Sequence, residues 1–190
     1  MKAFFLDRDG TVNEDYNFVH SPGQWTWCKG AIDAIRWMNR HQFKVIVVTN
    51  QSGVVRGRYT LEEVRRLHRW VDHQLKDHDA RVDDWLTAPW HPDFHEGRDP
   101  ALLKDRKPEI GMFEKARAKY GIDYRQSLMA GDKVSDLIPA VRLGITPFMI
   151  RSRFWDQQDH AWVCDNNIEV FDDLGAVVNR LEKDKRNPNS

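Results

Sequence analysis

Two aspartates near the start of the chain, Asp7 and Asp9, have the spacing of a reactive pair. They belong to the tetrapeptide D-R-D-G, directly after the apolar run Ala3–Leu6. That run predicts a buried strand, so the two carboxylates would lie at its tip. An aspartate can carry a covalent phosphoryl group, and a second carboxylate can serve the leaving group. The same four letters also occur in calcium loops and in ordinary turns, so the rest of the chain has to decide.

Other polar side chains follow later apolar runs. Thr49 and Asn50 end a β-branched run, Lys107 precedes a helical pattern, and Gly131–Asp132 follows a short apolar strand. Each has an ordinary alternative when taken alone: a helix cap for Thr49–Asn50, a surface charge for Lys107 and a turn for Gly131–Asp132. Together they supply a hydroxyl, a cation and a third carboxylate. That set suits phosphoryl transfer to water, which needs mainly positioning and charge neutralisation.

This hypothesis gives each side chain a role. Asp7 attacks phosphorus, and Asp9 protonates the leaving oxygen before it takes a proton from the hydrolytic water. Thr49 and neighbouring backbone amides donate hydrogen bonds to phosphoryl oxygens, while Lys107 holds the phosphate as a point charge. Asp7 and Asp132, with the main-chain carbonyl of Asp9, are the expected ligands of Mg²⁺, a cation that prefers oxygen ligands.

The elements that must position these residues alternate between strands and helices. The apolar patterns predict strands at 2–6, 44–49, 81–86, 127–130 and 145–150. Helices are predicted at 30–41, 60–76, 109–120 and 134–143, and a last one begins at a cap, Asp172. This alternation predicts an α/β fold with a central, mostly parallel sheet and right-handed crossovers. Ligands of such sheets bind beyond the carboxyl ends of the strands.

Length and charge limit the other possibilities. The 190 residues predict a single domain over 1–182, followed by a polar tail at 183–190 that frays. The formal net charge is zero, which gives no general electrostatic reason to expect a nucleic acid or membrane partner. No apolar stretch approaches about 18 residues, and the N-terminus has no signal-peptide pattern. We therefore expect a cytoplasmic protein, and a monomer.

The chemical residues stand in four motifs that resemble those of the haloacid dehalogenase superfamily of aspartate-nucleophile phosphatases. The motifs are FFLDRDGTVN, VTNQSG, DRKPEIGM and AGDKVSD, and they span Phe4 to Asp136. The forms DRDGTVN, TNQSG and RKP-x-x-GM are similar to a more specific branch. That branch contains the D-glycero-D-manno-heptose 1,7-bisphosphate phosphatases and histidinol-phosphate phosphatases.

The resemblance implies a Rossmannoid three-layer sandwich and a set of roles. Asp7 and Asp9 would be nucleophile and acid/base, Thr49 and Lys107 would stabilise the phosphoryl group, and Asp132 would bind Mg²⁺. The segments expected to contact substrate contribute Asp15, Tyr16, Asn17, Phe18, Asn50, Gln51, Ser52, Arg106 and Lys133.

The spacing of the motifs leaves no room for a separate cap domain. One loop, one helix and one strand separate Asp9 from Thr49, and the interval from Ser52 to Arg106 is also short. Specificity must then come from loops, at 14–27, 54–59 and 87–105. In the second loop Arg56, with Arg58, could meet a second phosphate, although solvated arginines are the ordinary alternative.

One departure from the branch concerns zinc. Its members often carry a structural zinc held by cysteine and histidine, but the matching positions here are Ala88, Trp90, Leu103 and Asp105. We therefore expect no structural zinc of that type. A different metal site at His91, Asp93 and His95 is an alternative, and a loop packed by aromatic residues is favoured over it.

The substrate is expected to be a small phosphorylated metabolite. The first candidate is the 7-phosphate of D-glycero-D-manno-heptose 1,7-bisphosphate, on a route to nucleotide-activated heptose for lipopolysaccharide or capsule. Histidinol phosphate or another small metabolite is the alternative. A nucleic acid 3′-phosphatase is disfavoured, because no basic, aromatic-rich groove is evident. From another class, the chain could be a non-catalytic binding protein on the same fold.

Overall fold

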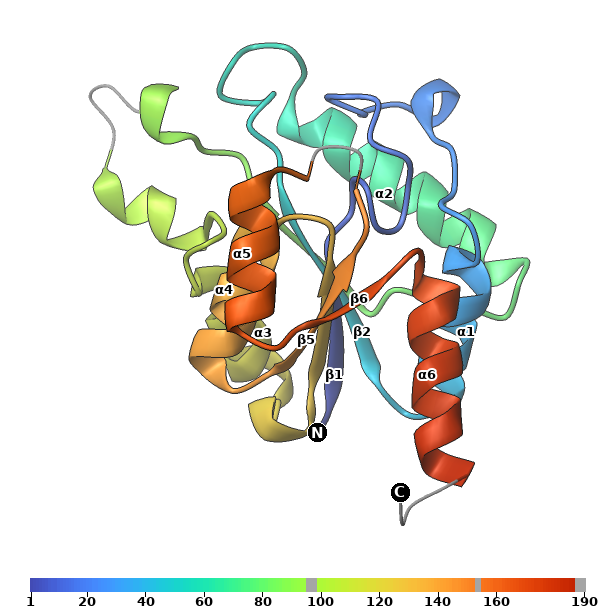
Figure 1. The fold of residues 1–190 in the computed structure, drawn as a ribbon. Helices are drawn as coiled ribbons and strands as arrows, with labels where there is room; N and C mark the ends of the chain where they lie inside the picture. The colour runs from blue at the N-terminus through green and yellow to red at the C-terminus, as the bar shows by residue number, and fades with distance from the viewer. Residues whose placement is uncertain (95–98, 153–154, 187–190) are drawn as a thin grey trace.

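A parallel sheet of six strands forms the centre of the molecule. The computed structural model describes residues 1–94, 99–152 and 155–186. The strands are β1 (Ala3–Leu6), β2 (Lys44–Asn50), β3 (Asp84–Ala88), β4 (Leu128–Gly131), β5 (Thr146–Ile150) and β6 (Glu169–Phe171). Their order is β3-β2-β1-β4-β5-β6, with every neighbouring pair parallel (Figure 1). The predicted α/β fold class is confirmed.

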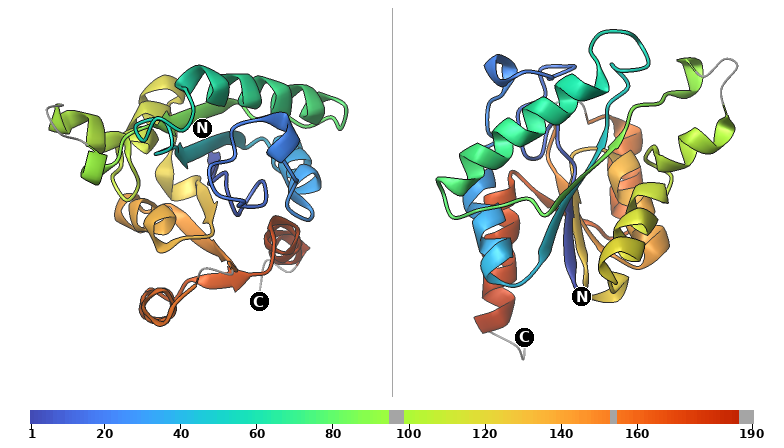
Figure 2. Two further views of the ribbon diagram at one scale, coloured as in Figure 1. Left: turned by 90° about the horizontal axis from the view of Figure 1, so that it is seen from above. Right: turned by 180° about the vertical axis from the view of Figure 1, so that it is seen from behind.

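Helices cover both faces of the sheet, which gives three layers. Within the described ranges they are α1 (Ala31–Arg40), α2 (Leu61–Lys76), α3 (Gly111–Tyr120), α4 (Val134–Leu143), α5 (Gln157–Asp165) and α6 (Leu174–Arg186). Helices α1, α2 and α6 share one apolar core with the sheet, and α3, α4 and α5 share the other (Figure 2). None of the described helices combines the length and apolar character needed to span a bilayer.

The strand that carries the aspartate pair is buried on both faces. Phe4 and Leu6 pack into the core beneath α1, α2 and α6, and Ala3 and Phe5 pack into the opposite core. This double burial explains why the run shows no alternation of apolar and polar residues. β1 therefore holds whatever follows it in a fixed place.

Local signals in the sequence set several of the predicted boundaries. Thr60 begins α2 with a capping box: its hydroxyl accepts from Glu63 N at 3.2 Å, and the Glu63 carboxylate accepts from Thr60 N at 2.7 Å. Gly121 and Gly144 end α3 and α4 in the left-handed region, as predicted.

The carboxyl ends of all the strands meet at one edge, where the long loops also lie (Figure 1). Residues 7–30, which follow β1, contain one short 3-10 helix (Pro22–Gln24), and residues 51–60, which follow β2, contain turns. β1 and β4 are neighbours here, and the chain winds outward from them in opposite directions. Such a switch point forms a crevice in which ligands bind.

Two predicted boundaries are wrong by a few residues. β3 begins at Asp84 instead of residue 81 and continues to Ala88, because the Asp83 carboxylate bonds Val45 N and Lys44 Nζ, both at 2.9 Å. α3 begins at Gly111 instead of residue 109, since Glu109 N closes a turn onto the Arg106 carbonyl at 2.8 Å.

The C-terminal part differs more from the prediction. Asp173 is the N-terminal cap of α6, because its Oδ1 accepts from Ala176 N at 2.8 Å; the predicted cap, Asp172, pairs instead with Arg151 at 3.0 Å. α6 continues to Arg186, so residues 183–186 of the predicted tail are helical, and 187–190 lie outside the described residues. Basic side chains in a last helical turn favour this extension.

Sequence patterns missed α5 and β6 altogether. α5 begins at a capping box in which the Asp156 carboxylate accepts from Gln158 N at 2.7 Å and Asp159 N at 2.9 Å. Its only fully buried side chain is Val163, so it lacks a clear apolar face. β6 is three residues long, too short for a periodic signal.

Candidate active site

Asp7 and Asp132 lie side by side at the tips of neighbouring strands. Asp7 directly follows β1, where its backbone N–H bonds the Ala130 carbonyl of β4 at 2.9 Å. Asp132 directly follows β4. Both are buried. Residues 125 positions apart thus meet at the switch point of the sheet, as the sequence predicts.

Lys107 is buried beneath the same strand tips. Its Nζ lies 2.5 Å from Asp7 Oδ1, 2.8 Å from Asp136 Oδ1 and 2.6 Å from the Val48 carbonyl. Burial alone would lower the pKa of Lys107, but the carboxylates of Asp136 and Asp7 outweigh it and raise that pKa. The ammonium is therefore charged and holds Asp7 in place.

Asp136 is a site residue that the sequence analysis missed. Besides its contact with Lys107, its Oδ2 accepts from the backbone N–H of Lys133 at 3.0 Å, at the start of α4. Oxygens of Asp7, Asp132 and Asp136 lie within 4.8 Å of one another. The sequence did contain a signal for Asp136, because it is a carboxylate in the first turn of the helix predicted after Gly131–Asp132. The first turn is the part of that helix that lies next to the strand tip.

Asp132 has the setting of a metal ligand. Both of its carboxylate oxygens are buried without a hydrogen-bond partner. Gly10 has φ +94°, and a Cβ there would lie 2.2 Å from Asp132 Oδ2, so the backbone approaches this carboxylate closely. Burial first, then the charges of Asp7 and Asp136, raises the pKa of Asp132 to about 8. Burial and Asp136 likewise raise the pKa of Asp7 to about 6, against the effect of Lys107. The buried, unpartnered carboxylate of Asp132, next to that of Asp7, fits a hard divalent cation.

The carboxylate of Asp9 accepts hydrogen bonds from several neighbouring side chains. Arg8 Nη2 donates to both of its oxygens, at 3.0 and 2.9 Å. Asn13 Nδ2 donates to Oδ1 at 3.0 Å, and Gln51 Nε2 donates to Oδ2 at 2.9 Å. The Asp9 side chain is 17% exposed, against 8% for Asp7, so Asp9 is the more accessible of the pair.

Gln51 connects Asp9 to the end of β2. Its amide nitrogen also donates to Thr49 Oγ1 at 2.8 Å, and its amide oxygen accepts from Tyr59 OH at 2.7 Å. Thr49, Gln51 and Tyr59 are all buried. Gln51 was predicted to contact substrate, and the structure places it between two of the predicted catalytic side chains. Tyr59 was not predicted at all.

Asn50 is engaged with the segment that carries Lys107. Its Oδ1 accepts from Lys107 N and its Nδ2 donates to the Lys107 carbonyl, both at 3.0 Å. This paired contact fixes the backbone of residue 107 beside β2. Asn50 therefore serves the position of Lys107, and its predicted contact with substrate stays a prediction.

The loop after β1 brings a second predicted segment to the same edge. Lys133 Nζ pairs with Asp15 Oδ2 at 3.2 Å, which joins this loop to the start of α4. Tyr16 is 53% exposed, and Asn17 and Phe18 both have positive φ, 62° and 58°. Two successive residues in the left-handed region make a tight turn, and the Arg58 guanidinium stacks on the ring of half-buried Phe18 at 4.4 Å.

Arg56 and Arg106 lie together at the outer part of the site. Burial, then the charge of Arg56, lowers the pKa of Arg106. Arg106 Nη1 donates to the Trp90 carbonyl at 3.1 Å, and Arg56 stacks on Phe94 at 4.2 Å. Half-buried Ser52 lies in the same loop as Arg56, whose N–H bonds the Ser52 carbonyl at 3.1 Å.

The alternative metal site in the third loop gains no support from the residues described. His91 Nδ1 accepts from Asp93 N at 3.2 Å, and its ring packs on Phe94. Burial and Arg106 lower the pKa of His91. His95 lies outside the described residues. The absence of a structural zinc stays a prediction.

Comparison with known proteins identifies the family. The model of the polynucleotide kinase 3 phosphatase family matches residues 2–161, which is most of the chain. The chain belongs to this family of haloacid dehalogenase-like phosphatases.

Individual relatives of this phosphatase carry a narrower description. It is 38% identical over 151 residues to D-glycero-beta-D-manno-heptose-1,7-bisphosphate 7-phosphatase of Escherichia coli (strain K12), covering 79% of each chain. The protein of the same name from Haemophilus influenzae is 33% identical over 183 residues, 96% of this chain and 99% of that one.

A solved structure agrees over almost the whole length. The crystal structure of D,D-heptose 1,7-bisphosphate phosphatase from B. bronchiseptica, complexed with magnesium and phosphate, has a TM-score of 0.81 and 28% identity. The match covers 97% of this chain and 99% of that chain. The haloacid dehalogenase-like fold is thereby confirmed.

Proposed function

We propose that this phosphatase hydrolyses the 7-phosphate ester of D-glycero-D-manno-heptose 1,7-bisphosphate through an aspartyl-phosphate intermediate. The observation that carries the chemistry is the buried group of Asp7, Lys107 and Asp132 at the tips of β1 and β4. The relatives named above support the choice of substrate.

Asp7 is the nucleophile in this proposal. Its Oδ1 is held by Lys107, which leaves the other oxygen to attack phosphorus. Lys107 and the Thr49 hydroxyl neutralise and orient the phosphoryl oxygens. The P–O bond to the sugar breaks as the bond to Asp7 forms, and water later breaks the aspartyl phosphate.

Asp9 is the acid and base of the two half-reactions. It gives its proton to the sugar oxygen as that oxygen leaves, and the resulting carboxylate then takes a proton from the attacking water. Five donor contacts, from Arg8, Asn13 and Gln51, fix the direction of this carboxylate. Its greater exposure suits a group that must reach both the substrate oxygen and water.

Asp7, Asp132 and the main-chain carbonyl of Asp9 would hold Mg²⁺, with Asp136 as a further carboxylate nearby. The buried, unpartnered oxygens of Asp132 support this assignment. A bound Mg²⁺ would neutralise charge between the anionic nucleophile and the anionic phosphate.

The second phosphate of the substrate is assigned to Arg56 and Arg106. Two neighbouring guanidinium groups suit a phosphate, and they do not suit the cationic amine of histidinol phosphate. We assign the sugar itself to Asp15, Tyr16, Asn17, Phe18, Asn50, Gln51, Ser52 and Lys133, as the sequence predicts. A single capless domain that ends with α6 at Arg186, a monomeric state and a cytoplasmic location complete the proposal.

A panel of phosphate esters tests the substrate. Purified protein with Mg²⁺ would be offered both anomers of heptose 1,7-bisphosphate, heptose 7-phosphate, fructose 1,6-bisphosphate, histidinol phosphate and a 3′-phosphorylated oligonucleotide. We expect the highest kcat/KM for a heptose bisphosphate, with heptose 1-phosphate as the product. Faster release from histidinol phosphate or from the oligonucleotide would contradict the substrate assignment.

A matched pair of variants tests the chemistry. Asp7→Asn should abolish phosphate release from every ester, whereas Asp33→Asn, on the exposed side of α1, should leave it unchanged. Retained activity in Asp7→Asn would eliminate the aspartyl-phosphate mechanism. A chelator should stop the reaction, and added Mg²⁺ should restore it.

A further inference from the structure

Arg8, between the two site aspartates, is completely buried, with 0% exposure. Its guanidinium holds the Asp9 carboxylate through Nε at 3.1 Å and Nη2 at 2.9 and 3.0 Å. Nη2 also donates to the Val19 carbonyl at 2.5 Å. Such a fork can orient a carboxylate only while the guanidinium itself is fixed.

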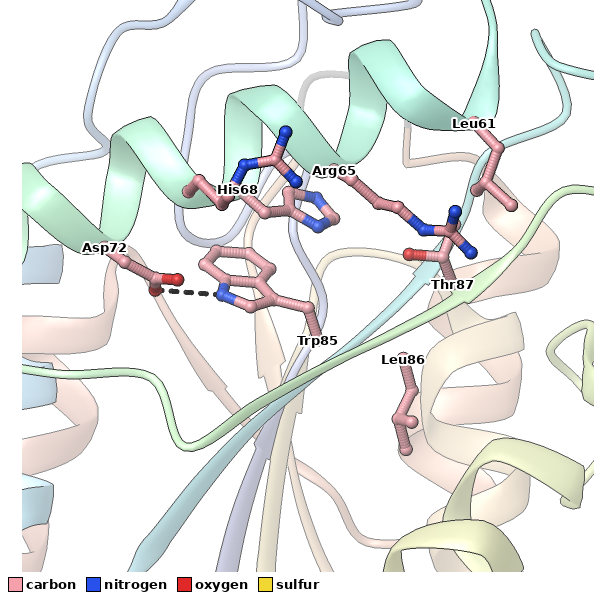
Figure 3. A pocket seen from close by; sticks show the side chains of 8 residues that line it. Leu61, Arg65, His68, Asp72, Trp85, Leu86 and Thr87 are labelled. Carbon is pink, nitrogen blue, oxygen red and sulfur yellow. Dashed lines mark hydrogen bonds between the residues drawn. The ribbon is translucent and has the colours of Figure 1, made fainter.

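His68, on the buried face of α2, provides a further fixed contact. Its Nε2 lies 3.3 Å from Arg8 Nη1, although the two residues are 60 positions apart. The imidazole stacks on the Trp85 indole, with centroids 4.1 Å apart, and Trp85 Nε1 in turn donates to Asp72 Oδ1 at 2.9 Å (Figure 3). Both His68 and Arg8 are buried.

His68 is neutral in this position. Burial, and then the charge of Arg8, lowers the pKa of His68 well below its usual value. A neutral imidazole has one acceptor nitrogen, and the cation opposite Nε2 makes that atom the acceptor and Nδ1 the protonated one. The contact is therefore a hydrogen bond donated by Arg8 to His68.

We propose that His68 is a positioning residue: it fixes Arg8, and through Arg8 it aims the Asp9 carboxylate at the leaving oxygen of the substrate. The inference rests on the acid/base role proposed above for Asp9. These contacts run from β3 through α2 to the loop after β1 as a stack and hydrogen bonds, with Arg8 and His68 buried and Trp85 and Asp9 half-buried at the two ends.

A cavity of about 380 Å³ between α2 and β3 lies next to this series of contacts (Figure 3). Arg65, His68, Arg69 and Asp72 line it from α2, and Trp85 lines it from β3. Both arginines face Glu62, at 4.0 and 2.7 Å. Arg65 therefore offers a control: it shares the cavity with His68, but its ion pair is with Glu62 and not with a residue of the site.

The leaving group provides the decisive test. A sugar oxygen needs a proton to depart, whereas nitrophenolate is stable as an anion and needs none. A misaimed general acid therefore slows hydrolysis of a sugar phosphate more than hydrolysis of p-nitrophenyl phosphate. A loss of folded protein lowers both rates by the same factor.

Two variants of His68 remove the atom that accepts the hydrogen bond from Arg8, and one variant keeps an acceptor there. His68→Phe retains a ring to stack on Trp85, and His68→Leu removes the ring as well. We expect kcat for the fastest sugar phosphate of the panel to fall roughly ten-fold more than kcat for p-nitrophenyl phosphate in both variants. His68→Gln, whose amide oxygen can accept from Arg8, and Arg65→Ala should keep the ratio of the parent protein.

Asp9→Asn separates this inference from the proposed function. It should show the largest preference for p-nitrophenyl phosphate. If Asp9→Asn loses both rates equally, the acid/base role of Asp9 fails. If Asp9→Asn shows the preference and His68→Phe and His68→Leu do not, the positioning role of His68 is overturned. If one of His68→Phe and His68→Leu does not fold, the other decides. If neither folds, His68→Gln decides: a changed ratio of the two kcat values in that variant also overturns the positioning role.

Discussion

The burial of the Asp132 carboxylate opposes folding. Both oxygens lack a hydrogen-bond partner, and its pKa is raised to about 8. A carboxyl whose pKa is raised on folding binds its proton more tightly in the folded state. Between its unfolded value, near 4, and about 8, folding stability therefore rises as pH falls.

Replacing Asp132 with asparagine should therefore stabilise the metal-free protein. At pH 8 we expect Asp132→Asn to raise the free energy of unfolding by about 1–2 kcal/mol, because a buried charge is removed. The same variant should lose the increase in thermal midpoint that Mg²⁺ gives the parent protein. Urea unfolding and thermal scans with and without Mg²⁺ measure both effects. A less stable variant that still responds to Mg²⁺ would contradict the metal assignment.

Lys107 stabilises the folded protein at the same site, because its positive charge compensates the carboxylates of both Asp7 and Asp136. Lys107→Met keeps the length of the side chain and removes the charge, so two buried carboxylates lose their counterion. We expect a destabilisation of about 3 kcal/mol at pH 8 and the loss of phosphatase activity. Urea unfolding is the measurement, with exposed Lys104→Met as the control. A change below about 0.5 kcal/mol would show that Lys107 does not hold these carboxylates.

At the scale of elements, the conformation of the loop after β2 depends on the close approach of Gly53 to the ring of Tyr59. A Cβ on Gly53 would lie 2.2 Å from the ring of Tyr59, which is itself buried and bonds Gln51. Gln51 in turn reaches both Asp9 and Thr49. The packing of one glycine is thus connected to the two side chains, Asp9 and Thr49, that Gln51 joins and that we propose to be catalytic.

Gly53→Ala should therefore lower activity by displacing Tyr59. We expect a loss of about 1–3 kcal/mol in stability, as in other overpacked sites, and a clear fall in kcat. Gly23→Ala is the matched control, because nothing lies within 4 Å of a Cβ there, and it should change stability by less than about 0.5 kcal/mol. Equal effects of the two substitutions in kinetics and thermal unfolding would refute the link through Tyr59.

Elements with local signals were predictable from the sequence. The β-branched run of β2, the capping box at Thr60 and Glu63, and the terminal glycines of α3 and α4 act within a few residues. The choice between Asp172 and Asp173 as the cap of α6 could not be predicted from the sequence. The two carboxylates are adjacent and differ only in which one the folded backbone turns toward the helix.

The site was predictable where it follows strand ends and unpredictable where it depends on distant contacts. Asp7, Thr49, Lys107 and Asp132 were found because parallel strands end at one edge. The contact of His68 with Arg8 joins residues 60 positions apart, and no pattern in the sequence announces it. The same holds for Tyr59, whose hydroxyl partner is known only once the loop is folded.

For the whole molecule, His68 makes stability depend on pH. Its pKa is lowered on folding, so the unfolded chain takes up a proton near pH 6.5 that the folded protein does not bind. This group stabilises the folded state above that pH, and the contribution is lost as pH falls below it.

The variant His68→Gln isolates that contribution. We expect the free energy of unfolding of the parent protein, minus that of His68→Gln, to fall by up to about 1.4 kcal/mol per pH unit below pH 6.5. Urea unfolding between pH 7.5 and 5.5 without metal measures it, and the titrations of the site carboxylates cancel in the difference. A difference that does not change with pH would mean that His68 takes up its proton as readily in the folded protein as in the unfolded chain, which would contradict the lowered pKa.

The central position of β1 in the sheet has a consequence during synthesis. β2 covers one flank of β1 early, but the other flank waits for β4, and Asp132 follows β4 directly. A nascent chain that has left the ribosome only as far as β3 would carry Asp7 and Asp9 without Lys107, Asp132 or Asp136. Such a chain holds Asp7 without its counterion Lys107 and lacks the third carboxylate, so the proposed site is complete only after more than two thirds of the chain has emerged.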